Sequence, residues 1–147
     1  MIRENWHVSY KPEIKEEDIR LPYKRVMLVE DSQVDVYLFQ NIFSRLCPDG
    51  TLYTFMVPGE ALAFLKTCDP QFLPELVIVD LFMPGKEHGL RFIHEFWNLP
   101  QHITAAIVMA YSAHVQESEG ELKELKERKM ILKYFSKPIS GKKVMAA

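Results

Sequence analysis

The sequence has no long apolar run and very little cysteine. No stretch approaches the roughly 20 apolar residues that a membrane-spanning helix needs, and the first ten residues lack the apolar core of a signal peptide. The two cysteines, Cys47 and Cys68, have no metal-ligand spacing, so a reduced, cytoplasmic setting without a disulfide is expected. The formal net charge of −2 argues against a nucleic-acid-binding surface, which needs clustered lysine and arginine. We therefore expect a globular cytoplasmic protein that binds neither a membrane nor nucleic acid.

Length and composition suit one domain. The chain has 147 residues, of which 48% are apolar and 26% are charged, as in an ordinary globular domain. Residues 1–23 are polar, contain Pro12 and Pro22, and are expected to form an N-terminal extension. Apolar residues such as Ile14 and Ile19 could pin this extension to a surface, although a mobile tail is the simpler expectation. Residues 24–147 should form the folded domain.

Short apolar segments alternate with helical patterns in residues 24–147. The expected strands are Arg25–Glu30, Thr51–Val57, Leu76–Val79, Thr104–Met109 and Met130–Phe135. The expected helices lie between Ser32 and Cys47, Pro58 and Thr67, Leu90 and Asn98, Val115 and Lys129, and within Ile139–Ala147. In the first of these helices, the apolar residues at helical spacing are Val34, Leu38, Ile42, Phe43 and Leu46. This alternation predicts an α/β fold: a doubly wound, five-stranded parallel sheet with helices on both faces.

Polar residues follow four of these strands at the point where each strand ends. They are Glu30 with Asp31, then Asp80, Ser112 and Lys137. Because the carboxyl ends of parallel strands meet at one edge of a sheet, these side chains should gather there. Asp80 alone could simply cap the loop that follows it. Three adjacent carboxylates, however, repel one another, and Mg²⁺ would hold all three ionised. A metal ion, an ammonium group and a hydroxyl group are what a phosphoryl group needs, and Asp80 is available to accept it as an acyl phosphate.

Four short patterns support this chemistry. V-E-D-S, D-L-F-M-P, Y-S-A and F-S-K-P occur in this order and resemble the receiver domain of bacterial two-component response regulators, from about Lys24 to the C-terminus. The resemblance implies a flavodoxin-like sheet with strand order 2-1-3-4-5. It also implies a stand-alone receiver that is phosphorylated by a sensor histidine kinase or phosphotransfer protein and docks to a downstream protein target. Such a protein is a switch rather than an enzyme, because it catalyses only its own phosphorylation and dephosphorylation.

The resemblance assigns roles around the metal ion. Asp80 is the phosphoacceptor and also a ligand of Mg²⁺. Asp31 binds the ion directly, Glu30 assists through water, and the backbone carbonyl group of Phe82 completes the protein ligands.

The resemblance also assigns roles around the phosphoryl group. Lys137 pairs with its oxygens, and a cis peptide bond at Pro138 holds the lysine loop in place. Ser112 is the hydroxyl residue that moves inward after phosphorylation, and Tyr134 is the aromatic residue that moves with it. Ordinary burial of an aromatic ring accounts for Tyr134 equally well.

Several positions depart from the family pattern. Gly89 lies nine residues after Asp80 where eight is usual, so the loop Gly85–His88 is expected to be one residue longer. Phe82 is large and apolar, and His114 lies two residues after Ser112. We expect Phe82 and His114 to flank the path of the attacking water and to set the lifetime of the phosphorylated state. The last helix is also short, which puts the usual output face in doubt.

Other functions remain open at this point. A pseudo-receiver would bind partners without phosphorylation. A phosphatase or phosphotransferase with an aspartate nucleophile would want a second aspartate two residues later, where Phe82 stands. A flavodoxin-like cofactor protein would need a phosphate-binding loop after the first strand, and none is evident. The polar helix Glu117–Lys129 is a candidate homodimer interface, but its charges also suit a solvated surface.

Overall fold

The computed structural model describes residues 14–81 and 88–146, without the side chain of His88. Five parallel strands form one sheet in the order β2-β1-β3-β4-β5. They are β1 (Arg25–Val29), β2 (Thr51–Phe55), β3 (Leu76–Asp80), β4 (Ile107–Ser112) and β5 (Lys133–Ser136). The predicted α/β class and the strand order 2-1-3-4-5 are therefore confirmed.

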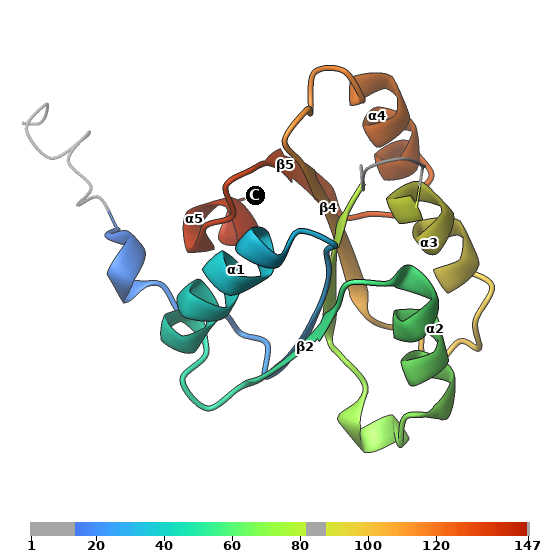
Figure 1. The fold of residues 1–147 in the computed structure, drawn as a ribbon, viewed down its shortest axis with the longest axis horizontal. Coiled ribbons are helices and arrows are strands. Elements are labelled where there is room, and N and C mark those ends of the chain that lie inside the picture. The colour runs from blue at the N-terminus through green and yellow to red at the C-terminus, as the bar shows by residue number, and fades with distance from the viewer. Residues whose placement is uncertain (1–13, 82–87, 147) are drawn as a thin grey trace, which may run out of the picture.

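Helices cover both faces of this sheet. Helices α1 (Gln33–Leu46) and α5 (Gly141–Met145) lie on one side. Helices α2 (Pro58–Thr67), α3 (His88–Phe96) and α4 (Glu119–Glu127) lie on the other (Figure 1). Alternate residues of each inner strand enter two separate hydrophobic cores, so that Leu28 packs toward α1 and Val29 toward α2 and α3. This double burial explains why β3 reads as an unbroken apolar run up to Asp80.

Helix α1 starts where the sequence predicts but turns a different face to the core. Ser32 caps the helix, because its hydroxyl oxygen accepts a hydrogen bond from the backbone N–H of Asp35 at 3.3 Å. The buried residues are Val36, Phe39, Phe43 and Leu46. Val34 and Leu38, which the apolar pattern groups with the core, are 68% and 43% exposed. The phase of the helix is set by the two Phe side chains, which fill more of the core than the smaller residues would.

The predicted boundaries are wrong in the last third of the chain. Strand β4 begins at Ile107 rather than Thr104, because its pairing partner Leu76 fixes the start. Helix α4 begins at Glu119 rather than Val115, after turns that include a hydrogen bond from the Ser118 hydroxyl to the His114 carbonyl. Strand β5 begins at Lys133 rather than Met130. The starts of β4 and β5 depend on pairing with strands distant in the sequence, whereas the start of α4 depends on the local turns after β4.

Part of the N-terminal extension is docked rather than mobile. Residues Glu16–Asp18 form a 3-10 turn, and the Glu16 carboxylate accepts hydrogen bonds from the backbone N–H groups of Gly141 and Lys142 at the start of α5. Leu21 is buried, and its N–H donates to the carbonyl of Leu46 at 3.0 Å. The apolar residues of this segment are few and scattered, so its polar composition predicts a mobile tail rather than a docked segment. The extension therefore supports α5, which has only five residues.

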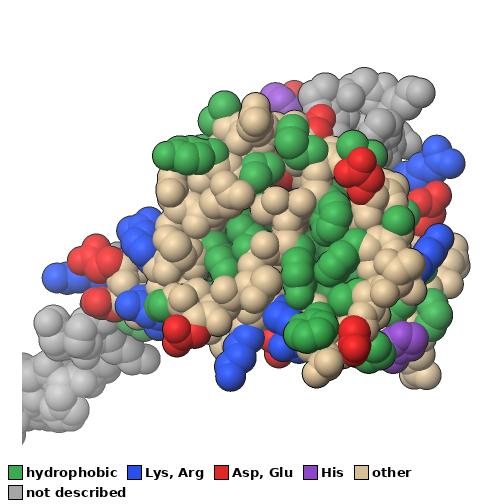
Figure 2. Space-filling model, turned by 60° about the horizontal axis from the view of Figure 1, so that its bottom comes forward, with side chains coloured by type: hydrophobic (Ala, Val, Ile, Leu, Met, Phe, Trp, Pro, Cys, Tyr) green, Lys and Arg blue, Asp and Glu red, His purple; other side chains and the backbone are tan. Residues whose placement is uncertain are grey.

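The surface mixes charged and apolar side chains. Figure 2 shows hydrophobic side chains in the middle of the face in view and most charged side chains toward its edge. Within residues 14–81 and 88–146, none of the helices is long and apolar enough to cross a membrane.

Candidate functional site

The sheet register brings the predicted polar residues to one edge. Val29 pairs with Val79, so Glu30 and Asp80, one residue further on, lie next to each other at the ends of β1 and β3. Ser112 ends β4 and pairs with Ser136, the residue before Lys137. The backbone N–H of Lys137 also donates to the carbonyl group of Ser112 at 3.0 Å. Parallel pairing alone therefore delivers these side chains to the same place.

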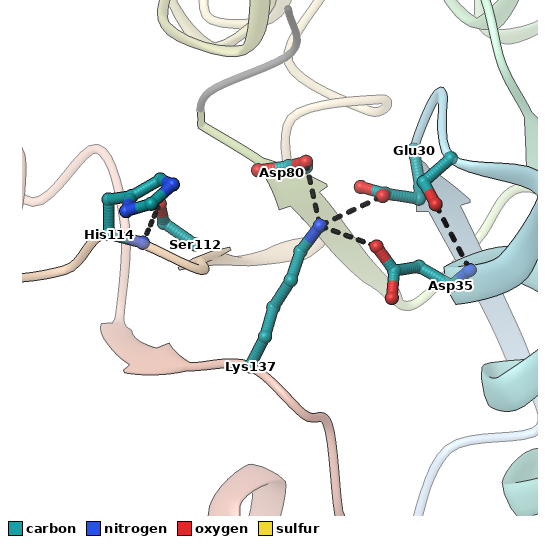
Figure 3. Close-up of polar contacts among 7 residues, drawn as sticks. Glu30, Asp35, Asp80, Ser112, His114 and Lys137 are labelled. Atoms are coloured by element: carbon teal, nitrogen blue, oxygen red, sulfur yellow. Dashed lines mark hydrogen bonds and ion pairs between the residues drawn. The ribbon is translucent and has the colours of Figure 1, made fainter.

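The ammonium group of Lys137 is at the centre of the site. Its Nζ atom donates hydrogen bonds to Glu30 Oε1 at 2.9 Å, Asp35 Oδ2 at 2.7 Å and Asp80 Oδ2 at 3.1 Å (Figure 3). Glu30 is fully buried, and Asp80 is 2% exposed. One cation thus bridges carboxylates that would otherwise repel one another at close range.

Asp35 is a site residue that the sequence analysis missed. It lies in the first turn of α1, three residues after the cap Ser32, and its side chain reaches back to Lys137. An acidic residue in the first turn of a helix is usually explained by its favourable interaction with the helix dipole, so the sequence alone gives no reason to assign it a second role. The available signal was its position, because a first-turn side chain points toward the strand end that precedes the helix.

The site shifts the pKa of its members in different directions. Burial, then the hydrogen bond and charge of Asp80, raise the pKa of Glu30 to about 9, although Lys137 opposes this shift. Burial also opposes ionisation of Asp35, but Lys137 and Glu30 hold the pKa of Asp35 below its ordinary value. Burial disfavours the charged form of Lys137, yet its three carboxylate partners raise its pKa above the ordinary value. Lys137 therefore carries its charge at neutral pH.

The acidic residues fit a small divalent cation. One carboxylate oxygen from each of Glu30, Asp31 and Asp80 lies within 4.8 Å of the other two. The set offers only oxygen ligands, as Mg²⁺ prefers, and Asp31 is partly exposed so that an ion could retain water. In addition, Glu30 Oε2 is buried and has no hydrogen-bond partner. A buried carboxylate oxygen without a partner is costly unless a cation or donor meets it.

Ser112 and His114 lie beside Asp80, away from Glu30 and Asp35 in the view of Figure 3. Ser112 is fully buried, and its hydroxyl oxygen accepts a hydrogen bond from the backbone N–H of His114 at 3.0 Å. The His114 side chain is exposed, with Nδ1 4.0 Å from a carboxylate oxygen of Glu117. The structure thus brings the backbone of His114 to the site, whereas its imidazole ring extends into solvent.

The remaining predicted residues lie on β5 and after it. Tyr134 is half-buried and packs against the core on the side of α2, α3 and α4. The peptide bond between Lys137 and Pro138 is cis, as the resemblance implies. Phe82 and the part of the predicted longer loop before His88 lie outside the described residues, so their roles stay predictions.

Gly89 makes a close contact that only glycine allows. A Cβ atom on Gly89 would lie 2.0 Å from the carbonyl oxygen of Asp80 and 2.6 Å from Leu81 Cα. The start of α3 is therefore packed directly on the backbone that carries Asp80. Although Gly89 is one position later than expected, it has a definite structural role in this site.

Comparisons with known proteins give structural matches only. No family model and no curated protein matches the sequence. Among solved structures, the Mn²⁺-bound form of response regulator Rcp1 is 24% identical, with a TM-score of 0.63 over 78% of this chain and 81% of that one. The phosphorylated cyanobacterial phytochrome response regulator RcpA is 21% identical, with a TM-score of 0.64 over 83% and 86%. A response regulator receiver protein from Dyadobacter fermentans is 17% identical, with a TM-score of 0.67 over 78% and 87%.

Identities this low establish a shared fold. The structures that match are mostly response regulator receivers, and they cover most of the chain. The resemblance inferred from four short patterns and the match found in three dimensions therefore agree. This chain has the fold of the receiver domains of two-component response regulators.

Proposed function

We propose that this protein is a phosphorylation-controlled switch whose Asp80 accepts a phosphoryl group from a sensor histidine kinase or a phosphotransfer protein. The observation that carries the proposal is the gathering of Glu30, Asp31, Asp80 and Lys137 around one point at the strand ends. A fold-level likeness would be insufficient alone, because one fold hosts many functions. The residues at the site are those that phosphoryl transfer to a carboxylate requires.

The transfer step follows from the positions of these groups. A carboxylate oxygen of Asp80 forms a bond to phosphorus while the phosphorus–nitrogen bond of a phosphohistidine breaks. The departing imidazole keeps the bonding electrons and takes up a proton from solvent. Lys137, now 3.1 Å from Asp80 Oδ2, is placed to pair with the phosphoryl oxygens as charge spreads over them.

A divalent cation fits the acidic residues gathered beside Lys137. Glu30, Asp31 and Asp80 would hold Mg²⁺, and the carbonyl group of Phe82 is proposed as a further ligand. When bound, the ion supplies positive charge that offsets the negative charge of the phosphoryl group and the clustered carboxylates. The partly exposed Asp31 leaves this side of the site open to the solvent.

The switch is proposed to act through Ser112 and Tyr134. The Ser112 hydroxyl oxygen is now hydrogen-bonded to the His114 backbone, so binding a phosphoryl oxygen would rearrange the turn after β4. Tyr134 lies on the neighbouring strand β5, and a rearranged turn would change the space available to its half-buried ring. The result is a change in the surface around α4 and β5 that a partner protein can recognise.

A small phosphodonor tests the proposal without the natural kinase. The protein is incubated with Mg²⁺ and acetyl phosphate and then examined by intact-mass spectrometry. We expect one phosphoryl adduct, lost when EDTA removes Mg²⁺ and lost in Asp80→Asn, but kept in Asp49→Asn, a surface substitution of the same kind. Persistent absence of an adduct would favour a pseudo-receiver. Continuous turnover of unrelated phosphoesters would favour a hydrolase with an aspartate nucleophile.

The lifetime of the adduct is a separate question. His114 and Phe82 are proposed to control the approach of water, and the imidazole of His114 is exposed, with Nδ1 4.0 Å from a carboxylate oxygen of Glu117. Phe82→Asn and His114→Ala should each change the rate at which the adduct is lost. Unchanged rates in both variants would contradict this role.

A further inference from the structure

Tyr111 lies directly beneath the site, although no sequence pattern assigns it a function. It is the residue before Ser112 on β4, and it pairs in register with Asp80 on β3 and with Phe135 on β5. Paired residues of adjacent strands point to the same face of a sheet. The Tyr111 ring accordingly packs into the core on the side of α1 and α5, with Phe135 at 5.9 Å between ring centroids.

The hydroxyl group of Tyr111 is buried without a partner. Within residues 14–81 and 88–146, only two buried side-chain polar atoms lack a hydrogen bond, namely Tyr111 Oη and Glu30 Oε2. The Tyr111 hydroxyl group is a donor, and the carboxyl oxygen of Glu30 is an acceptor. Native proteins rarely leave such atoms unpaired, because each one costs about 1–3 kcal/mol. Two complementary unpaired atoms in one small region therefore point to a contact made in another state of the site.

Electrostatic interactions show that the two groups lie near each other. Burial, then the charges of Glu30, Asp80 and Asp35, and last the approach of the hydroxyl group to the Glu30 side chain, raise the pKa of Tyr111 well above its ordinary value. The hydroxyl group thus keeps its proton and remains a donor.

The ring of Tyr111 also contacts the central cation. Lys137 Nζ lies 5.1 Å from the ring centroid, within the range of a cation–π interaction. The face of the Tyr111 ring thus contacts the ammonium group, and its hydroxyl group lies near Glu30. A smaller apolar residue at this position would do neither.

We propose that Tyr111 is a positioning residue of this site, whose hydroxyl group donates a hydrogen bond to Glu30 Oε2 when the carboxylates hold a divalent cation. The inference rests on the proposed function and adds to it a residue that acts through Glu30. Groups that orient metal-ligating carboxylates by hydrogen bonds commonly change metal affinity by about 10–100-fold. Without the ion, the hydroxyl group makes no hydrogen bond and therefore does not stabilise the fold.

The proposal predicts effects of opposite sign for one substitution. Tyr111→Phe keeps the ring and its contact with Lys137 but removes the hydroxyl group. We expect about tenfold weaker Mn²⁺ binding, followed by the electron paramagnetic resonance signal of the free ion. We also expect equal or greater resistance to urea in the presence of EDTA, because an unpaired buried group has been removed. A residue that only supports the fold would not separate these two measurements.

Tyr53→Phe is the matched control, since it removes the phenolic hydroxyl group of a tyrosine on β2 that donates to the carbonyl group of Phe72, away from the site. It should leave Mn²⁺ affinity unchanged. Equal Mn²⁺ affinity of the wild-type protein and Tyr111→Phe would overturn the inference while leaving the proposed function standing. If the wild-type protein binds no Mn²⁺ and forms no acyl phosphate, the proposed function itself fails. An equal loss of affinity in both variants would also overturn the specific role of Tyr111.

Discussion

Replacing Lys137 by methionine would test whether one ammonium group holds the site together. Methionine keeps most of the apolar stem and removes the three hydrogen bonds to Glu30, Asp35 and Asp80. The side chain of Lys137 is only 17% exposed, so water cannot fully replace the lost cation. We therefore expect a marked loss of stability in the absence of a divalent ion.

The size of the loss follows from the burial of each carboxylate. Removing one partner of a buried ion pair typically costs about 3–5 kcal/mol. Two features reduce the cost here. Glu30, whose pKa is raised to about 9, can remain protonated at neutral pH, and the side chain of Asp35 is 28% exposed to water. The remaining charge on the buried Asp80 still has to be accommodated, so we expect a loss of about 3 kcal/mol.

Urea unfolding in EDTA measures this loss, and two further variants define its origin. Lys123→Met removes a surface lysine whose ion pair with Glu119, at 3.4 Å, is exposed, and should change the free energy of unfolding by less than about 1 kcal/mol. Adding Asp80→Asn to Lys137→Met should recover at least about 1 kcal/mol, because the uncompensated buried charge is gone. If Lys137→Met is no more destabilising than Lys123→Met, the reasoning from buried charge is refuted.

Four other substitutions test three separate features of the fold. Gly89→Ala should destabilise the protein by at least about 2 kcal/mol in urea unfolding, since its Cβ would lie 2.0 Å from the Asp80 carbonyl oxygen. Gly120→Ala is the control: a Cβ there would lie in open space within α4, so this substitution should stabilise the protein by about 0.5–1 kcal/mol. Burial opposes ionisation of Glu75, but two backbone N–H groups at the start of β1, at 2.7 and 3.1 Å, hold its pKa below the ordinary 4.5. The ionised Glu75 side chain therefore stabilises the fold above pH 4.5, and this stabilisation is lost as the pH falls through the lower pKa of the folded state. Glu75→Gln should lower the free energy of unfolding by about 1 kcal/mol at neutral pH and by less in acid. A difference between wild type and Glu75→Gln that does not change with pH would contradict this. Lys129 has a φ of 59° after α4, so Lys129→Gly should raise the free energy of unfolding by about 1 kcal/mol, and a decrease would show that the Lys129 side chain matters more than the backbone strain.

The sequence was most informative where burial is uniform. The inner strands are covered on both faces, so each reads as a short apolar run whose end is marked by the first charged or hydroxyl-bearing polar residue, as at Asp80 and Ser112. Those run ends predict Glu30, Asp80, Ser112 and Lys137 as residues of one site. The strand order, in contrast, came from the family resemblance, because alternation of strands and helices is compatible with several orders.

Features that depend on distant partners could not be predicted. The start of β4 is set by its pairing with β3, and the docking of Glu16 depends on hydrogen bonds from the backbone N–H groups at the start of α5. Asp35 was missed because its partner, Lys137, lies 102 residues away in the chain. Tyr111 was missed because an aromatic residue in a strand is ordinarily a core residue, and only its unpaired hydroxyl group distinguishes it.

The most direct test of the central claim is to find where the phosphoryl group is attached. After incubation with Mg²⁺ and acetyl phosphate, borohydride reduction converts an aspartyl phosphate to homoserine, and tandem mass spectrometry of the peptides locates it. The site contains other carboxylates, notably Glu30, Asp31 and Asp35, so the position of the label discriminates among them. We predict homoserine at position 80 and nowhere else. Homoserine at position 31 or 35, or no reduced residue at all, would contradict the assignment of Asp80 as the phosphoacceptor.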